Sequence, residues 1–155
     1  MTPYRVREVR TEEDRAAAFA VRRAVFVVEQ GVPEEIEYDA YDATAVHVIA
    51  EHTADGVTLG TGRLLYGPDA AGRTGGAEGV GALGRLAVTR EARGLGVGAA
   101  LVRAIEDAAR ARGLTAVDLH AQTHALDFYR RLGYGPYGEE FLDAGIPHLA
   151  MRRTL

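Results

Sequence analysis

A glycine-rich turn that joins an apolar strand to an amphipathic helix restricts the fold of this chain more than any other feature. Residues 80–88 (VGALGRLAV) are nearly all apolar, which is typical of a central β-strand. Residues 90–98 (REARGLGVG) form the turn, and residues 97–112 repeat apolar side chains every three to four positions, as a helix packed on a sheet does. Gly113 is a natural helix stop. This unit predicts an α/β fold.

Further strands and helices are predicted on both sides of this unit. Alternating or apolar patterns predict strands over residues 4–10, 45–52, 57–66, 114–121, 134–139 and 147–153. Helices are predicted over residues 11–28 and 123–132, and the glycine-rich residues 67–79 are predicted to be a mobile loop. This order is not a regular βαβ alternation, so we expect a mixed α/β sheet flanked by helices. The length and the lack of internal repeats predict one domain over residues 1–155.

The residues that the chain lacks exclude several kinds of chemistry. It has no cysteine, which excludes disulfides, thiolate metal sites and a cysteine nucleophile. It also has no lysine, which excludes a Schiff base and the lysine of a nucleotide P-loop. The net charge of −4 and the lack of a basic tract argue against nucleic acid as a partner. No apolar run is long enough to span a membrane and no secretory signal is visible, so we expect a cytoplasmic protein.

The glycine turn has the properties of an anion-binding site. Free N–H groups at the start of a helix attract a phosphate, glycines allow close approach, and Arg93 adds a charge-assisted contact. A tight turn needed only for packing is the simpler alternative. A dinucleotide fingerprint is a third reading, since Gly94, Gly96 and Ala99 fit GxGxx[GA]. Against it, five residues separate the strand from Gly94, and Asp118 lies in mid-strand rather than at a strand's carboxyl end.

Two separate motifs resemble those of the GNAT superfamily of N-acetyltransferases. Arg93-x-x-Gly96-x-Gly98 resembles the [QR]-x-x-G-x-[GA] pyrophosphate loop of that family. Residues 125–134 (ALDFYRRLGY) are similar to its A-x-x-F-Y-x-x-x-G-[FY] segment. Residues 23–30 and 138–148 extend the resemblance to small bacterial members of the ElaA and YjcF type. The resemblance therefore covers essentially the whole chain.

This resemblance implies a fold and a coenzyme. The family fold has a mixed, mostly antiparallel central sheet that splays at the coenzyme cleft and is flanked by helices. The coenzyme would be acetyl-CoA, bound by the strand backbone, by the glycine turn and by a polar residue after the next strand. In this sequence the corresponding residues are Leu86, Ala87, Val88, Arg93, Gly94, Leu95, Gly96, Val97, Gly98, Ala99 and Gln122.

The resemblance also implies a catalytic acid. Tyr129 matches the family's tyrosine near the coenzyme sulfur, where a phenol protonates the departing thiolate. The alternative interpretation is that Tyr129 only packs against its neighbours and takes no part in catalysis. The activity implied is direct transfer of an acetyl group to an amine. The absence of cysteine agrees with a mechanism that has no cysteine-bound intermediate.

The sequence leaves the catalytic base and the acceptor amine open. The strand at residues 80–88 has no acid, so the candidates for the base are Glu29, His47, His120 and Glu140. Glu29, Gln30, His47 and Glu140 are also the candidates for contacting the substrate. His120 and His124 have His-x-x-x-His spacing without an adjacent glutamate, so we expect no metal site.

The acidic segment at residues 29–42 bears on the substrate. It has two competing interpretations: its carboxylates gather a cationic amine, or they form a solvated loop. The acceptor would be a small amine, an N-terminal amine or a lysyl amine. A non-catalytic acyl-CoA sensor of the same fold and a nucleotide-binding oxidoreductase remain alternatives, and the architecture allows a homodimer. The six carboxylates of the segment belong to Glu29, Glu34, Glu35, Glu37, Asp39 and Asp42.

Overall fold

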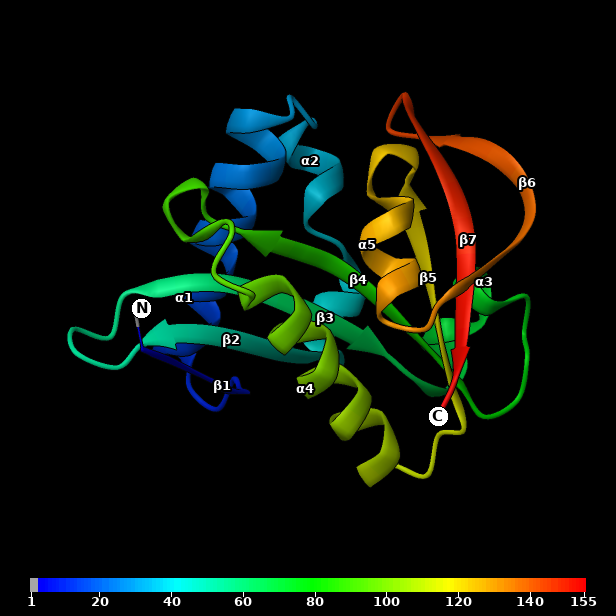
Figure 1. Cartoon of the computed structure of the whole chain (residues 1–155), viewed down its shortest axis with the longest axis horizontal. Coiled ribbons are helices and arrows are strands. Elements are labelled where there is room, and N and C mark those ends of the chain that lie inside the picture. Colours follow the sequence, from blue (N-terminus) through cyan, green and yellow to red (C-terminus); the bar gives the residue numbers. More distant parts are fainter. Residues whose placement is uncertain (1–2) are drawn as a thin grey trace.

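A computed structural model of the protein describes residues 3–155. Its strands form one sheet in the order β1-β2-β3-β4-β5-β7-β6 (Figure 1). The element order confirms the predicted mixed α/β fold. No helix in the described part of the chain is long and apolar enough to cross a membrane. The strands are β1 Tyr4–Glu8, β2 Val46–His52, β3 Thr58–Leu65, β4 Val80–Val88, β5 Ala116–Gln122, β6 Gly135–Asp143 and β7 Ile146–Thr154.

Three of the predicted segments match the structure only in part. The helix expected over residues 11–28 is α-helical over Glu12–Arg22, where Thr11 accepts a hydrogen bond from the Asp14 N–H, and then continues as a π-helix over Arg23–Glu29. The acidic segment and the glycine-rich loop, expected to be irregular, contain short helices. The α-helices are α1 Glu12–Arg22, α2 Glu34–Glu37, α3 Ala71–Thr74, α4 Val97–Ala111 and α5 Leu126–Arg131.

The sheet is antiparallel except where β4 meets β5. These two strands pair in parallel only from Val80 to Leu83 and from Ala116 to Leu119. Beyond that point, β4 continues beside β3 as far as Val88, and β5 continues beside β7 as far as Gln122. The second halves of β4 and β5 are therefore not hydrogen-bonded to each other, which confirms the predicted splay.

Helices cover both faces of the sheet beside this opening (Figure 1). Leu101 and Ile105 of α4 are fully buried in the main core. Glycines of β3 allow α4 to lie close: a Cβ at Gly62 would come within 2.8 Å of Ile105 Cδ1. On the other face, α1 and the π-helix pack Val21 and Val25 against Ala87 of β4. The unpaired edge of β4 thus lies between α4 on one face of the sheet and α1 with the π-helix on the other.

A bulge interrupts β4 immediately after the strands part. The register with β3 shifts between Thr61 and Arg63, opposite Gly84 and Ala87. Arg85 has a φ of 51°, a left-handed conformation that is uncommon for a residue with a side chain. The bulge directs its guanidinium toward α2, where Nε donates to the Glu37 carbonyl at 3.1 Å. The sequence pattern gave no sign of this bulge.

Candidate active site

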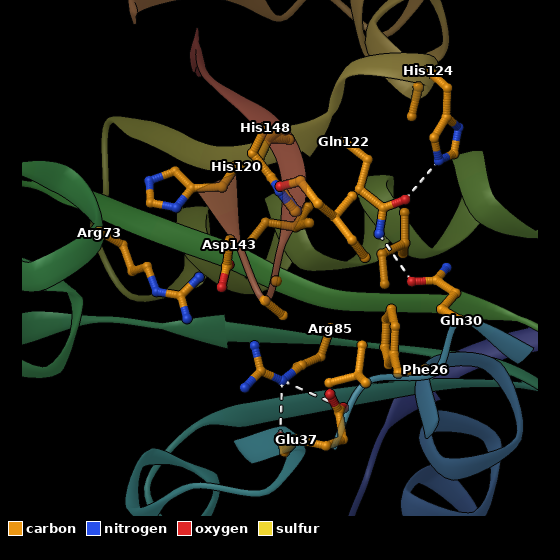
Figure 2. Close-up of a pocket in the computed structure, with 18 of the residues that line it drawn as sticks. Phe26, Gln30, Glu37, Arg73, Arg85, His120, Gln122, His124, Asp143 and His148 are labelled. Atoms are coloured by element: carbon orange, nitrogen blue, oxygen red, sulfur yellow. Dashed lines mark hydrogen bonds and ion pairs between the residues drawn. The ribbon is translucent and has the colours of Figure 1, made fainter. Parts of the chain in front are cut away.

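A cavity of about 250 Å³ lies where β4 and β5 part (Figure 2). Its walls come from the second halves of these two strands, from the π-helix and α2, from α3, from the start of α5 and from the turn between β6 and β7. Segments that are distant in the sequence therefore meet at one place. A second hollow, of about 470 Å³, lies between residues 67 and 114 and is lined mainly by glycine, alanine and other apolar residues. The first cavity has more polar and titratable side chains.

The glycine turn leads directly into α4. Gly94 and Gly96 adopt φ values of 85° and 80°, which glycine tolerates without strain. The first N–H groups of α4, like those of any helix, have no partner within the helix, and no side chain in residues 3–155 caps them. Together with the helix dipole, these N–H groups make the turn suited to an anion, as its sequence predicted.

Arg93 is tied to the π-helix by an ion pair. Its two terminal nitrogens donate to the Glu29 carboxylate at 2.7 and 2.8 Å, and its Nε donates to the Val88 carbonyl at 3.2 Å. The hydrogen bonds from Arg93 lower the pKa of Glu29. Glu29 was predicted to contact the substrate, but its carboxylate binds Arg93 and does not line the cavity.

Tyr129 lines the cavity from α5 and is only 9% exposed. Its hydroxyl makes no hydrogen bond within residues 3–155, and burial raises its pKa well above the ordinary value of 10.0. Tyr134, close to it in the chain, is different: its hydroxyl donates to Glu106 Oε2 at 2.8 Å. One buried phenol is thus committed to a structural contact, while the other is free to act on a bound molecule.

Three polar side chains form a chain of hydrogen bonds at one end of the cavity (Figure 2). Gln122 Nε2 donates to Gln30 Oε1 at 3.0 Å, and Gln122 Oε1 lies 2.6 Å from His124 Nε2. Gln30 follows Glu29, the partner of Arg93, so this end of the cavity is the one next to the glycine turn. The structure thereby brings together the predicted residues Gln30 and Gln122.

Two further histidines line the cavity. Burial, followed by the nearby charge of Arg73, lowers the pKa of His120, so its imidazole is neutral at pH 7. His148 Nδ1 lies 2.7 Å from the Ile146 carbonyl. A carbonyl only accepts, so Nδ1 donates this hydrogen bond, and Nε2 is the ring nitrogen that the Ile146 carbonyl does not engage. The sequence analysis named His120 as a candidate but did not single out His148.

The comparisons with known proteins decide the family. A family model described as an acetyltransferase (GNAT) domain matches residues 29–155. The chain belongs to the GNAT acetyltransferase family. It is 40% identical over 145 residues to the N-acetyltransferase YjcF of Bacillus subtilis, covering 93% of this chain and 95% of YjcF.

Solved structures agree with this assignment. An acyl-CoA N-acyltransferase from Pseudomonas aeruginosa is 34% identical with a TM-score of 0.79, and the match covers 99% of each chain. Escherichia coli ElaA is 25% identical, with the same TM-score and the same coverage. This GNAT protein is accordingly an acyltransferase, of a family that uses an acyl-CoA cosubstrate and acts on amines. Both family motifs quoted above lie within the matched residues.

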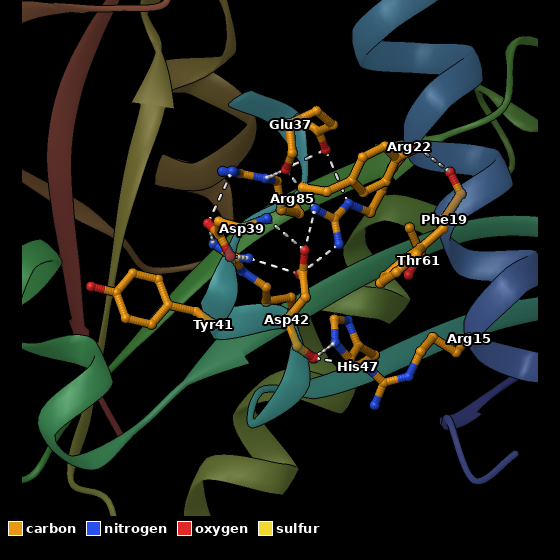
Figure 3. A network of polar contacts seen from close by, with 12 residues as sticks. Arg15, Phe19, Arg22, Glu37, Asp39, Tyr41, Asp42, His47, Thr61 and Arg85 are labelled. Carbon is orange, nitrogen blue, oxygen red and sulfur yellow. Dashed lines mark hydrogen bonds and ion pairs between the residues drawn. The ribbon is translucent and has the colours of Figure 1, made fainter. Parts of the chain in front are cut away.

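Next to the cavity, the GNAT chain contains a closed network of buried ion pairs (Figure 3). Arg22 Nε lies 3.0 Å from Glu37 Oε1, and Arg22 Nη1 lies 2.7 Å from Asp42 Oδ1. Arg63 Nη1 lies 2.8 Å from the same Asp42 oxygen and 2.7 Å from Asp39 Oδ1. Burial alone would raise the pKa of Asp42, but the bonds from Arg22 and Arg63 lower it to about 2.

This network corrects the interpretation of the acidic segment. Glu37, Asp39 and Asp42 were considered either solvated or free to gather an amine, but all three bind arginines from α1, β3 and β4. Their partners were not visible in the sequence because they lie far away along the chain. These three carboxylates are therefore an internal part of the fold, while Glu34 and Glu35 are exposed to solvent.

The two remaining substrate candidates lie outside the cavity. His47 is 4% exposed, its Nε2 lies 2.9 Å from the Asp42 carbonyl, and its Nδ1 has no partner in the described residues. It packs beside Phe19 of α1. Glu140 is exposed on β6 and does not line the cavity. Within residues 3–155, no group of His, Asp and Glu is arranged to hold a metal ion.

Proposed function

We propose that this GNAT protein transfers the acetyl group of acetyl-CoA directly to a primary amine held in the cavity between β4 and β5. We also propose that residues 1–155 form one catalytic domain. The observation that carries the proposal is the parting of β4 and β5 over a cavity next to the N-terminus of α4. The Tyr129 hydroxyl in this cavity and the first N–H groups of α4 have no side-chain partner within residues 3–155. The cavity has room for a thioester, Tyr129 can donate a proton to its sulfur, and the start of α4 can bind the anionic part of the same molecule.

The residues around the opening fit coenzyme A. The first N–H groups of α4 and the guanidinium of Arg93 provide donors for a pyrophosphate. The part of β4 that β5 leaves unpaired offers backbone groups to an extended amide-containing arm, as an exposed strand edge does. Gln122 offers a side-chain amide beside it. The proposed binding residues are Leu86, Ala87, Val88, Arg93, Gly94, Leu95, Gly96, Val97, Gly98, Ala99 and Gln122.

Tyr129 is the proposed general acid. Acetyl-CoA supplies an activated acyl group whose departure leaves a thiolate, which needs a proton. The raised pKa of Tyr129 keeps its hydroxyl protonated at neutral pH, and no protein group within residues 3–155 competes for that proton by hydrogen bonding. The thiolate gains the proton as the amine nitrogen forms its new bond to the acyl carbon.

The amine must also lose a proton. His120, whose ring is neutral, and His148, whose Nε2 is not engaged by the Ile146 carbonyl, line the same cavity at its acceptor end. We propose that the base comes from this pair, directly or through water. Glu29, His47 and Glu140, the earlier candidates, lie outside the cavity lining.

The proposal is tested by measuring CoA release with a thiol reagent, because the chain has no cysteine to react. Tyr129→Phe is compared with Tyr134→Phe, which removes a hydroxyl from a neighbouring structural tyrosine. We expect Tyr129→Phe to lower kcat about 100-fold, with the dissociation constant of CoA nearly unchanged. Tyr134→Phe should retain most of the rate at temperatures where it is folded.

Two results would overturn this assignment. If Tyr129→Phe keeps the wild-type kcat, Tyr129 is not the acid. If wild-type protein binds acetyl-CoA but releases no CoA with polyamines, amino acids, aminoglycosides, arylamines or peptides, the chain behaves as a sensor.

A further inference from the structure

We infer that the acceptor amine also carries a carboxylate, and that Arg73 binds this carboxylate at the end of the cavity opposite the glycine turn. The inference rests on the proposed acetyl transfer and names the class of its acceptor: aminocarboxylates such as amino acids and short peptides with a free C-terminus. It replaces the cationic amines suggested by the acidic segment.

Arg73 is an unpaired cation in a cavity wall. Within residues 3–155, the arginine side chains that make neither a salt bridge nor a hydrogen bond are those of Arg10, Arg73 and Arg131. Arg10 and Arg131 are exposed to solvent, whereas Arg73 is half-buried and lines the cavity. A partly desolvated guanidinium with all its N–H donors free is suited to bind an anion.

Arg85 adds a second free donor in the same cavity. Its Nε and Nη2 are occupied by the Glu37 carbonyl, the Ile36 carbonyl and Asp39, but Nη1 has no partner among the described residues. The side chain lines the cavity and is 15% exposed. Because Arg85 is fixed by α2 and the β4 bulge, it presents this nitrogen without needing to reorganise.

The acids in the cavity wall do not cancel these charges. Glu37 is held by Arg22 and is 3% exposed, so it is not available to a ligand. Asp143 is drawn next to Arg73 in Figure 2, but it is exposed to solvent and forms no salt bridge with Arg73 or Arg85. A polyamine would bring further positive charge toward two arginines, whereas a carboxylate complements them.

The position of Arg73 assigns it to the acceptor rather than to the coenzyme. Figure 2 shows Arg73 at one end of the cavity and Gln30 and His124 at the other. Gln30 follows Glu29, which binds Arg93 of the glycine turn. The coenzyme would enter from that side, which leaves the end with Arg73 for the second substrate.

The test compares acids with their amides at a fixed acetyl-CoA concentration. Glycine, β-alanine, 4-aminobutyrate and a dipeptide are each paired with the corresponding carboxamide, so that only the charge changes. We expect kcat/KM to be about tenfold to a hundredfold higher for the acid in the pair whose spacing fits best. Arg73→Gln should raise KM for that acid about tenfold or more, leaving its kcat and the amide's kinetics nearly unchanged. Arg131→Gln, an exposed arginine outside the cavity lining, is the matched control.

A binding measurement separates this inference from the proposed function. The melting temperature of the CoA-bound protein is recorded with each acid and each amide. Stabilisation by an acid, lost in Arg73→Gln and kept in Arg131→Gln, supports the carboxylate site even if no CoA is released, in which case the acetyl-transfer proposal alone fails. The inference is overturned if acids and amides act equally on wild-type protein, or if only amines without a carboxylate are acetylated.

Discussion

Two groups of polar residues, the ion-pair network and the cavity lining, meet at Glu37 of α2 and use their arginines in different ways. In the closed network, Arg22 and Arg63 are each only 1% exposed and bind the carboxylates of the acidic segment. In the cavity, neither the Arg73 guanidinium nor the Tyr129 hydroxyl has a side-chain partner among residues 3–155. The buried ion pairs fix the position of the cavity wall. The polar groups in the cavity that have no protein partner are available to a ligand.

Arg85 and Glu37 connect the two groups. Arg85 donates to the carbonyl of Glu37 and to Asp39 in the network, while both Arg85 and Glu37 line the cavity. The network therefore fixes the position of one cavity wall. We expect changes in the network to reduce stability first, and changes in the cavity to reduce activity first.

Breaking the network should have the largest effect. Arg22→Met leaves the buried carboxylates of Glu37 and Asp42 without their main partner, and we expect the free energy of unfolding to fall by about 3–5 kcal/mol. Urea denaturation measures this change. Arg131→Met, at an exposed position, should stay within about 0.5 kcal/mol of wild type. Equal losses for the two variants would contradict a structural role for the network.

Acid should weaken the same network. The pKa of Asp42 is about 2 in the folded protein, below its ordinary value of 3.8. A lowered pKa favours the folded state above the unfolded pKa, and this contribution is lost as the pH falls through the folded pKa. We expect a loss of roughly 2 kcal/mol between about pH 5 and pH 2. Asp42→Asn should be less stable at pH 7, with a shallower decline over this range; an equally steep decline would assign the acid sensitivity to other carboxylates.

Tyr129 and Tyr134, which are close in the chain, allow a paired and an unpaired buried hydroxyl to be compared directly. Tyr134→Phe removes a hydrogen bond to buried Glu106, so we expect a loss of about 1–3 kcal/mol in the free energy of unfolding. Tyr129→Phe removes a hydroxyl with no partner in the described residues and should change stability by less than about 0.5 kcal/mol. Thermal or urea unfolding of both variants tests this, and the reverse order would contradict the assignment of the Tyr129 hydroxyl to the cavity rather than to a structural contact.

The smallest effect is expected at the ion pair between Glu29 and Arg93. This pair is partly exposed, so Glu29→Gln should change stability by less than about 1 kcal/mol. Removing the carboxylate frees the guanidinium for a pyrophosphate, so CoA should bind a few times more tightly, as measured by titration calorimetry. A large loss of CoA affinity would instead show that Glu29 holds Arg93 in its binding position.

The parts of the site that local patterns encode were predicted from the sequence. The glycine turn and the helix behind it depend on residues that are adjacent in the chain, and α4 begins at Val97 as expected. The cleft was anticipated from the family resemblance, and the register of β4 and β5 shows where the strands part. Gln30, Gln122 and Tyr129 all line the cavity.

The parts that depend on distant contacts were not predicted. The partners of Asp42 lie on α1 and β3, and no spacing in the sequence connects them. Arg73 was overlooked because it lies in a glycine-rich segment that resembled an irregular loop, although that segment folds into α3 beside the cavity. His47 was a candidate because it is a polar residue in an apolar strand. In the structure its ring makes a buried hydrogen-bond contact with the Asp42 carbonyl instead.

The central claim is that the opened half of β4 is where coenzyme A lies. Amide hydrogen exchange, followed residue by residue with NMR spectroscopy, tests it most directly. Saturating CoA should slow exchange at those amides of residues 84–88 that face the opening and at residues 94–99, while residues 80–83, already paired with β5, should not change. Slowed exchange elsewhere with residues 84–99 unaffected, while calorimetry shows CoA bound, would contradict the account.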